Sequence, residues 1–247
     1  MFQNTKALVL REVRYKEADR ILTILSDTGG KMTVKARGAL RKGSRLTAAT
    51  QQLTYSEMTL FGNKGKYTVN EASILEDFAG LRGDITTLAL GCYFAECAEA
   101  MAVEDQPDTE LLQLTLNSLY ALSKGLYDSR QIKAAFELRL ASVAGYTPDL
   151  TYCCVCGNPE PERPCLSLSD GKIACSACRD MNFERPLPLK PDTLEAMRYI
   201  INAPAKKLFS FRAEVGCLQD LSNAAERYFL RQADRSFASL DYWRKLT

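Results

Sequence analysis

The sequence contains no histidine among its 247 residues. Histidine supplies the base of Ser-His-Asp and Cys-His nucleophilic sites and a ligand in many zinc sites, so these sites are excluded. The chain also lacks any apolar run near the roughly 18 to 20 residues that span a bilayer. Met1 to Leu10 has neither the apolar core nor the cleavage site of a secretory signal. We therefore expect a globular cytoplasmic protein.

Nucleotide-binding and nuclease signatures are missing as well. The string Gly38-x4-Gly43-Ser44 resembles a phosphate-binding loop, but the lysine that should follow its second glycine is absent. No Gly-x-Gly-x-x-Gly string occurs. Asp19, Glu57 and Glu76 fall on different predicted strands, so they give no carboxylate cluster for metal-assisted cleavage. The sequence predicts a protein that is not an enzyme.

Nine cysteines are present, an odd number that argues against a disulfide framework. Cys153-x2-Cys156 and Cys175-x2-Cys178 are separated by 18 residues, a spacing typical of four-thiolate zinc sites. Two such turns complete a tetrahedron around one Zn2+ and leave no position for water, so we expect a structural site. A redox role is the alternative, but it would call for one motif at a strand-helix junction.

Two other cysteines compete for the same metal in the sequence. Cys154 stands between two predicted ligands at the wrong spacing, and Cys165 lies midway along the insert. The remaining three, Cys92, Cys97 and Cys217, fall in predicted helices, where a small buried thiol is the usual interpretation.

The first 80 residues read as five strands separated by turn signals. A lone domain of this kind suits a small barrel, of which the OB-fold is a common nucleic-acid-binding example, and an SH3-like barrel fits nearly as well. The predicted strands are Lys6 to Tyr15, Asp19 to Ser26, Gly30 to Ala39, Gln52 to Gly62 and Gly65 to Glu76.

Positive charge is concentrated in this barrel. Met1 to Gly80 carries 13 Lys and Arg against 8 Asp and Glu, whereas Gly83 to Pro148 carries 4 against 9. On the third predicted strand the pleat places Met32, Val34 and Ala36 inside and basic residues outside. This pattern is typical of a phosphate-backbone surface, although a solvated strand face that protects a sheet edge is the alternative. The candidate binding residues are Lys31, Lys35, Arg37, Arg41, Lys42, Arg45, Lys64 and Lys66.

The rest of the chain reads as helical. Asp84, Asp108 and Asp128 are predicted N-caps, and Gly125 and Gly145 are predicted helix ends. Tyr146 to Pro191 reads as an irregular Cys-rich insert, and helices are expected over 192–203 and 213–246. The predicted fold is α+β: an OB-fold DNA-binding domain over 1–80, then a helical domain over 81–247 with a zinc module inserted at about 149–190.

The order of these parts resembles the RecO family of DNA-repair proteins, over nearly the whole chain. The opening Ala7-Leu8-Val9-Leu10 and Tyr15-x-Glu17-x-Asp19-Arg20-Ile21-Leu22 is similar to the start of that family. Its basic signature is matched by Gly30-Lys31 and Ala36-Arg37-Gly38-Ala39-x-Arg41-Lys42-x-Ser44-Arg45-Leu46. Further matches are Phe136-Glu137-Leu138-Arg139-Leu140, Gly145-Tyr146-x-Pro148, the first Cys-x2-Cys-Gly, Tyr228-Phe229 and Arg235-Ser236.

The resemblance implies a nucleoid-associated protein that binds single- and double-stranded DNA and anneals complementary strands. It also implies that the protein partners with RecR and helps load RecA onto strands coated by the single-strand DNA-binding protein. The acidic C-terminal tail of that coating protein would dock on the helical part. Some family members lack the cysteines, which supports a structural role for zinc.

A tail-docking site needs cations beside an apolar pocket. The candidates are Lys133, Arg139, Arg227, Arg231 and Arg235, although ordinary solvated helix charges explain each of them equally well. Tyr228, Phe229, Phe237, Tyr242 and Trp243 are better explained as core than as a binding stripe. The alternative function is a zinc-containing scaffold for repair proteins with only incidental DNA binding.

Overall fold

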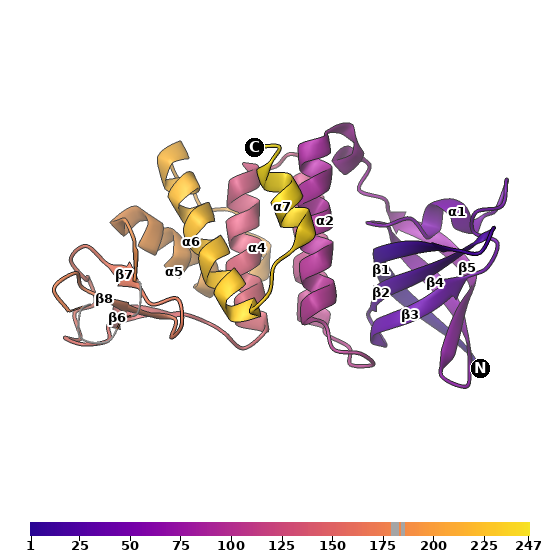
Figure 1. Ribbon diagram of the computed structural model, residues 1–247, viewed down its shortest axis with the longest axis horizontal. Helices are drawn as coiled ribbons and strands as arrows, with labels where there is room; N and C mark the ends of the chain where they lie inside the picture. The colour runs from indigo at the N-terminus through magenta and orange to yellow at the C-terminus, as the bar shows by residue number, and fades with distance from the viewer. Residues whose placement is uncertain (179–182, 184–185) are drawn as a thin grey trace. The chain divides into compact units, whose positions relative to one another are not determined.

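The structure is a computed structural model that describes residues 1–178, 183 and 186–247 (Figure 1). It contains two compact units. Unit 1 comprises Met1–Lys124 with Phe237–Thr247, and unit 2 comprises Gly125–Ser236. In the described part of the chain, no helix has the length and apolar character needed to cross a membrane.

Unit 1 begins with a closed five-stranded barrel in the order β1-β2-β3-β5-β4. Neighbouring strands are antiparallel except for β3 and β5, which pair in parallel through Val34 with Tyr67 and Lys35 with Thr68. This confirms the predicted OB-fold barrel. Its strands are β1 (Phe2–Tyr15), β2 (Asp19–Ser26), β3 (Gly30–Ala36), β4 (Tyr55–Asn63) and β5 (Lys66–Glu76).

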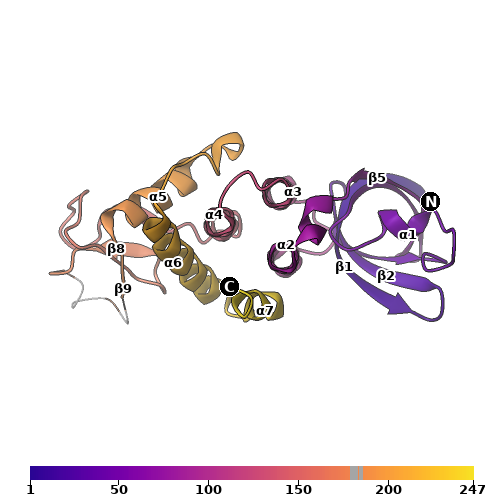
Figure 2. The same ribbon diagram turned by 90° about the horizontal axis from the view of Figure 1, so that it is seen from above.

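The connection from β3 to β4 differs from the prediction. β3 ends at Ala36 because Gly38 adopts a positive φ of 65° and donates its N–H to the Asp19 carboxylate at 2.8 Å. The connection then forms a short helix, α1 (Leu46–Ala49), which the sequence pattern did not predict. Leu46 packs against the barrel core, so α1 covers one end of the barrel (Figure 2).

The barrel core is built from every second residue of the strands, as the pleat requires. The alternation predicted for β3 is confirmed, because Met32, Val34 and Ala36 are buried while Thr33 between them is exposed. The buried apolar set is Ala7, Val9, Leu22, Ile24, Met32, Val34, Ala36, Ala39, Met58, Leu60 and Val69.

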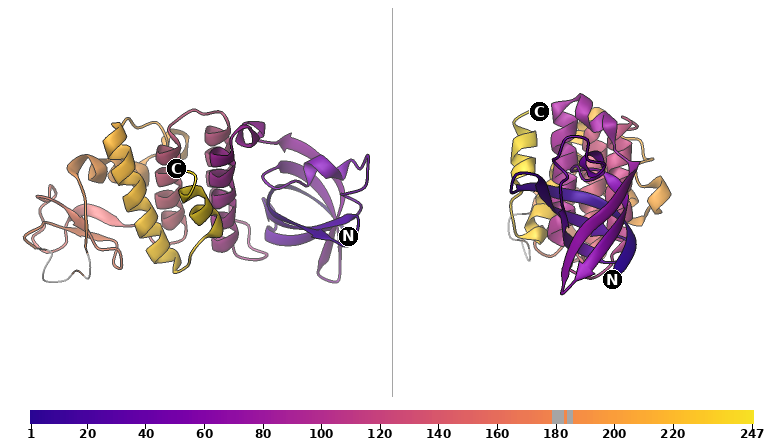
Figure 3. Two further views of the ribbon diagram at one scale, coloured as in Figure 1. Left: turned by 45° about the horizontal axis from the view of Figure 1, so that its top comes forward. Right: turned by 90° about the vertical axis from the view of Figure 1, so that its right-hand side faces the viewer.

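Helices complete unit 1: η1 (Ala79–Gly83), α2 (Ile85–Met101), α3 (Thr109–Ser123) and α7 (Ala238–Arg244). The predicted caps are confirmed, since the Asp84 carboxylate accepts from Thr87 N at 2.7 Å and Asp108 accepts from Leu111 N at 2.9 Å. These bonds satisfy amides that the first helical turn leaves unpaired. α7 lies along α2 (Figure 3), and Glu96 accepts from the Ser239 amide at the start of α7.

The stretch predicted as helical over 213–246 is helical for most of its length but is divided into two helices. α6 (Val215–Ala233) ends where Asp234 adopts a left-handed conformation with φ of 47°, and α7 begins only at Ala238. The break returns the chain to unit 1, where Phe237 packs edge-on against Tyr93 with ring centroids 5.6 Å apart.

Unit 2 is built around α4 (Ser129–Val143) and α6, with α5 (Pro191–Asn202) and η3 (Ala205–Lys207) beside them. Asp128 caps α4 as predicted, and Gly145 ends that stretch with φ of 88°. Between α4 and α6 lies a buried ion cluster. The Lys133 ammonium pairs with Glu137 at 2.9 Å and with Glu226 at 2.7 Å, and Lys133 and Glu137 are fully buried.

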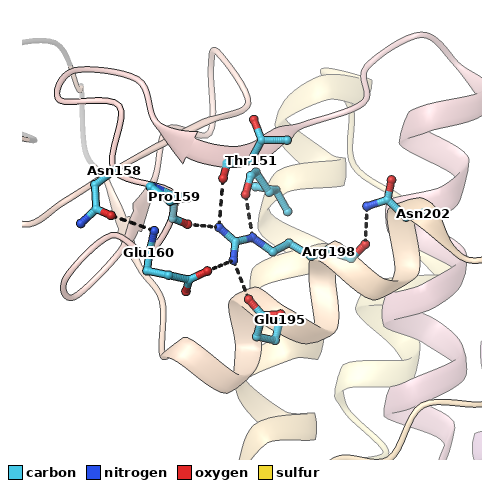
Figure 4. A network of polar contacts seen from close by, with 8 residues as sticks. Thr151, Asn158, Pro159, Glu160, Glu195, Arg198 and Asn202 are labelled. Carbon is cyan, nitrogen blue, oxygen red and sulfur yellow. Dashed lines mark hydrogen bonds and ion pairs between the residues drawn. The ribbon is translucent and has the colours of Figure 1, made fainter.

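The insert predicted as irregular contains a small sheet in the order β6-β8-β7-β9. Its strands are β6 (Asp149–Cys153), β7 (Cys165–Leu166), β8 (Lys172–Ala174) and β9 (Leu187–Pro188). Arg198 of α5 ties this sheet to the helices (Figure 4). Its guanidinium donates to the carbonyls of Leu150, Thr151 and Pro159 and pairs with Glu195 and Glu160.

The buried ion cluster predicts a large effect of removing its cation. Lys133→Met removes a buried cation that pairs with two carboxylates, so the free energy of unfolding should fall by about 3–5 kcal/mol. Chemical denaturation measures this change. Lys206→Met, at an exposed lysine of η3, is the matched control and should change the unfolding free energy by less than ~0.5 kcal/mol. An equally small change in unfolding free energy for Lys133→Met would contradict a stabilising role for the buried ion cluster.

The Arg198 contacts predict local loosening on substitution. Arg198→Lys keeps the charge but loses the planar fork that reaches several carbonyls at once. Hydrogen exchange of the amides over residues 149–160 should accelerate by about 10- to 100-fold, as loss of charge-assisted hydrogen bonds implies, while α4 and α6 keep their protection. Arg244→Lys in α7 serves as the control. Uniform acceleration throughout unit 2 would refute a local role.

Candidate nucleic-acid interface and metal centre

Two of the eight basic candidates on the barrel are engaged by the protein itself. The Lys31 ammonium donates to the Glu99 carbonyl of α2 at 3.3 Å. Lys35 pairs with Asp19 at 2.8 Å and lies over the Tyr15 ring, 4.8 Å from its centroid. The hydrogen bond from Lys35, followed by that from the Gly38 amide, lowers the pKa of Asp19. Asp19 is therefore ionised at neutral pH and offsets the charge of Lys35.

The other six basic candidates are exposed. In the described part of the chain none of them takes part in an ion pair, so their charges are available to an external anion. They lie after β3 and on the β4–β5 hairpin, where the sequence pattern placed them. These residues are Arg37, Arg41, Lys42, Arg45, Lys64 and Lys66.

A hollow on the barrel surface brings two of these cations together. Arg37, beyond the end of β3, and Lys66, at the start of β5, both line a cavity of about 470 Å³. The parallel pairing of β3 with β5 explains this, because it places residues far apart in sequence at neighbouring positions. The sequence pattern missed the uncharged members of the lining other than the aromatic Phe61, which are Leu46, Asn63, Thr68, Val69 and Asn70.

The four predicted metal ligands converge at one point. The sulfur atoms of Cys153, Cys156, Cys175 and Cys178 all lie within 4.8 Å of one another, and Cys156 Sγ is 3.8 Å from Cys175 Sγ. A tetrahedral metal with sulfur bonds of roughly 2.3 Å has sulfur–sulfur edges of about 3.8 Å. The cluster can therefore hold one metal ion. Gly157, with φ of 74°, makes the tight turn after the second cysteine.

The two competing cysteines stand outside this cluster. Cys154 is exposed, and its amide donates to the Ile173 carbonyl in the sheet. Cys165 is buried, with its thiol directed to the Ala174 carbonyl at 3.3 Å. The four cysteines that the spacing argument selected from the six of the insert are thus the four whose sulfur atoms lie together.

The cluster is electrostatically suited to a cation. Burial alone would raise the pKa of Cys153, but donation from the Cys156, Cys175 and Val155 amides outweighs it and lowers the pKa to about 6. Burial and the neighbouring sulfurs raise the pKa of Cys175, and that of Cys178 to about 12. A bound cation would relieve the repulsion that prevents all four thiols from ionising.

The cations suggested for peptide docking do not form one surface. Lys133 is fully buried against Glu137 and Glu226, so we do not carry it into the docking proposal. Arg139 donates to the carbonyls of Ile200 and Ala203 at the end of α5. Arg227, Arg231 and Arg235 are exposed, in or just after α6. Of the five aromatic residues interpreted as core, Tyr228, Phe229, Phe237 and Trp243 are buried, whereas Tyr242 is half exposed.

Two family models together match almost the whole chain. Residues 1–78 match the model described as recombination protein O N terminal, and residues 82–241 match recombination protein O C terminal. Among curated relatives, the "DNA repair protein RecO" of Acetivibrio thermocellus is 36% identical, covering 99% of this chain and 97% of that protein. The protein of the same name from Heliobacterium modesticaldum is 32% identical, and the match covers 88% of this chain and 80% of that protein.

A third relative of the same name, from Alkaliphilus metalliredigens, is 28% identical over the full length of both chains. This chain belongs to the RecO family of DNA-repair proteins.

Proposed function

We propose that this chain binds single- and double-stranded DNA through its barrel and anneals complementary strands without breaking any bond. The observation that carries the proposal is a set of six exposed cations on the barrel that form no ion pair with the residues the structure describes, two of which share one hollow. Phosphate contacts of this kind displace condensed counterions and supply affinity without sequence preference. Lys31 and Lys35, which are engaged within the protein, would contribute at the edge of this surface.

Annealing follows from the same electrostatics. Two strands repel each other through their phosphates, and cations that neutralise both strands lower this repulsion and raise the local concentration of complementary bases. Each step is binding or release, so no nucleoside triphosphate is required. A mechanism made only of binding and release steps supports a mediator of strand annealing rather than an enzyme.

The proposed partners follow from family membership. We place RecR and the single-strand DNA-binding protein beside this chain in the nucleoid, where it would help load RecA onto coated strands. An acidic tail with an apolar end requires cations at the rim of an apolar surface. Arg227, Arg231 and Arg235 are the exposed candidates for this contact, and Arg139 lies at the end of α5.

We propose zinc as the ion of the four-cysteine cluster. Four thiolates with tetrahedral spacing are the ligand set of structural zinc sites, and the closed shell leaves no position for a reacting water. The ion would hold the small sheet that Arg198 fastens to α5, and its binding energy would contribute to the folding of this insert.

The DNA-binding proposal predicts the effect of neutralising the hollow. Arg37→Gln combined with Lys66→Gln should weaken binding to single strands of any sequence and reduce the slope of log affinity against log salt by about 2. Fluorescence anisotropy across a salt series measures both quantities, and the annealing rate should fall in parallel. Lys206→Gln with Lys207→Gln removes the same charge from exposed positions in unit 2. Equal losses in the two double variants would defeat the assignment of the barrel surface.

The zinc proposal predicts one ion per chain in protein purified without chelator, as measured by elemental analysis. Cys175→Ser should abolish stoichiometric zinc and lower the thermal stability of unit 2, since a hydroxyl is a poor replacement for the thiolate. Cys154→Ser, at the neighbouring exposed cysteine, is the control and should retain the ion. Zinc content near zero in the unaltered protein would disprove the assignment.

A further inference from the structure

The hollow between Arg37 and Lys66 contains more than positive charge. Leu46 and the buried Val69 supply apolar surface, Phe61 is a 40% exposed ring, and Asn63 and Asn70 contribute amide side chains. A site built only for phosphate would need cations and backbone amides. Apolar surface, a ring and amides together suit a flat ligand whose faces are apolar and whose edge forms hydrogen bonds.

A β-bulge supplies one of these amides. In the β4–β5 pairing Leu60 lies opposite Val69, whereas Thr59 lies opposite Glu71, so Asn70 has no partner in β4. The extra residue shifts the alternation of β5. Val69 is buried, and Asn70 is exposed on the outer side with Thr68 and Lys66. Asn70 thus keeps the outward side of Lys66 and Thr68, and the bulge turns Ala72, two residues further on, inward to the core.

The aromatic wall is also held in place. Phe2 of β1 is the direct cross-strand partner of Phe61. Their rings pack at a centroid distance of 5.2 Å and an interplanar angle of 54°. The pair stays on the outer surface, with Phe2 60% exposed, although the barrel interior is available to apolar side chains on the other face of both strands. Exposed aromatic rings next to cations are the features on which single-stranded nucleic acids stack.

We infer that this hollow is a subsite for one unpaired nucleobase of single-stranded DNA. The base stacks on Phe61 and its edge hydrogen-bonds to Asn63 and Asn70, while Arg37 and Lys66 hold the flanking phosphates. A base within a duplex cannot enter, because its faces are covered by neighbouring pairs and its edge is already bonded. This inference rests on the proposed DNA binding and adds a means of distinguishing single strands from duplex.

The distinction has a consequence for annealing. Each strand would be held by a base contact in addition to its phosphates, and pairing removes that base from Phe61. The duplex product therefore retains only the phosphate contacts, which weakens its hold on the barrel relative to the two separate strands.

The test compares two ligands with the full-length protein. Phe61→Ala should lower affinity for an oligothymidine strand about tenfold, since stacking of one base on an aromatic ring is worth about that factor. Affinity for a blunt duplex of equal length should stay within twofold. Tyr120→Ala, which removes a 45% exposed tyrosine beside Lys124 on α3, is the matched control and should change neither. Equal losses for strand and duplex, or no loss for either, would overturn the subsite.

A second variant guards against a folding defect at Phe61. Phe61→Trp restores a stacking surface, so it should bind the strand at least as tightly as the unaltered protein, and its indole fluorescence should be quenched by the strand but not by the duplex. An abasic strand of equal length should bind the unaltered protein and Phe61→Ala with the same affinity. Quenching by both ligands, or a persisting difference on the abasic strand, would refute base stacking.

The outcomes also separate this inference from the proposed function. If the Arg37 and Lys66 double variant loses DNA while Phe61→Ala behaves as the unaltered protein, the barrel binds DNA but the base subsite is wrong. If neither change affects binding, both proposals fail.

Discussion

A closed barrel of five strands fills its interior with alternate side chains, and this constraint decides which residues of unit 1 reach solvent. On β3 it buries Met32, Val34 and Ala36 and sends Lys35 outward. On β5 the bulge at Asn70 changes the alternation once, so that Ala72 packs against the core as Val69 does, while Asn70 stays on the outer face. Arg37, Lys66 and the ring of Phe61 share one hollow on that outer face.

The two units differ in whether their basic side chains are buried in ion pairs or exposed to solvent. In unit 2 the protein buries Lys133 between two carboxylates, where the ion cluster fixes the packing of α4 against α6 and is closed to other molecules. In unit 1 the cations after β3 and on the β4–β5 hairpin have no such partners among residues 1–178, 183 and 186–247. Lys35 is intermediate between these two situations. Asp19 compensates the charge of Lys35, and the Lys35 ammonium lies over the ring of Tyr15. The number of basic residues alone would not distinguish these roles.

The sequence predicted the features that depend on local pattern. Strand alternation, the three aspartate caps and the pairwise spacing of the metal ligands are encoded within a few residues of one another, and all of them are found in the structure. The features it missed depend on tertiary contacts. Nothing local marks Phe61 and Asn70 as neighbours of Arg37, because that proximity comes from parallel pairing of β3 with β5.

The same reason explains the two errors in the helical part. Lys133 reads as a solvated helix charge until Glu226, distant in sequence, is placed beside it. The break at Asp234 was missed because aspartate is compatible with a helix, and the left-handed turn is favoured here by the packing of Phe237 on Tyr93. The β6–β9 sheet was missed because its strands are too short to show an alternating pattern.

The return of α7 to unit 1 bears on how the chain is made. Phe237–Thr247 follows all of unit 2 in sequence, yet Phe237 is buried against Tyr93 of α2. During synthesis the ribosome releases the barrel and α2 long before this segment emerges. The hydrophobic surface around Tyr93 therefore stays without its Phe237 cover until the whole of unit 2 has been synthesised, and exposed apolar surface of this kind makes a partly made chain prone to aggregate.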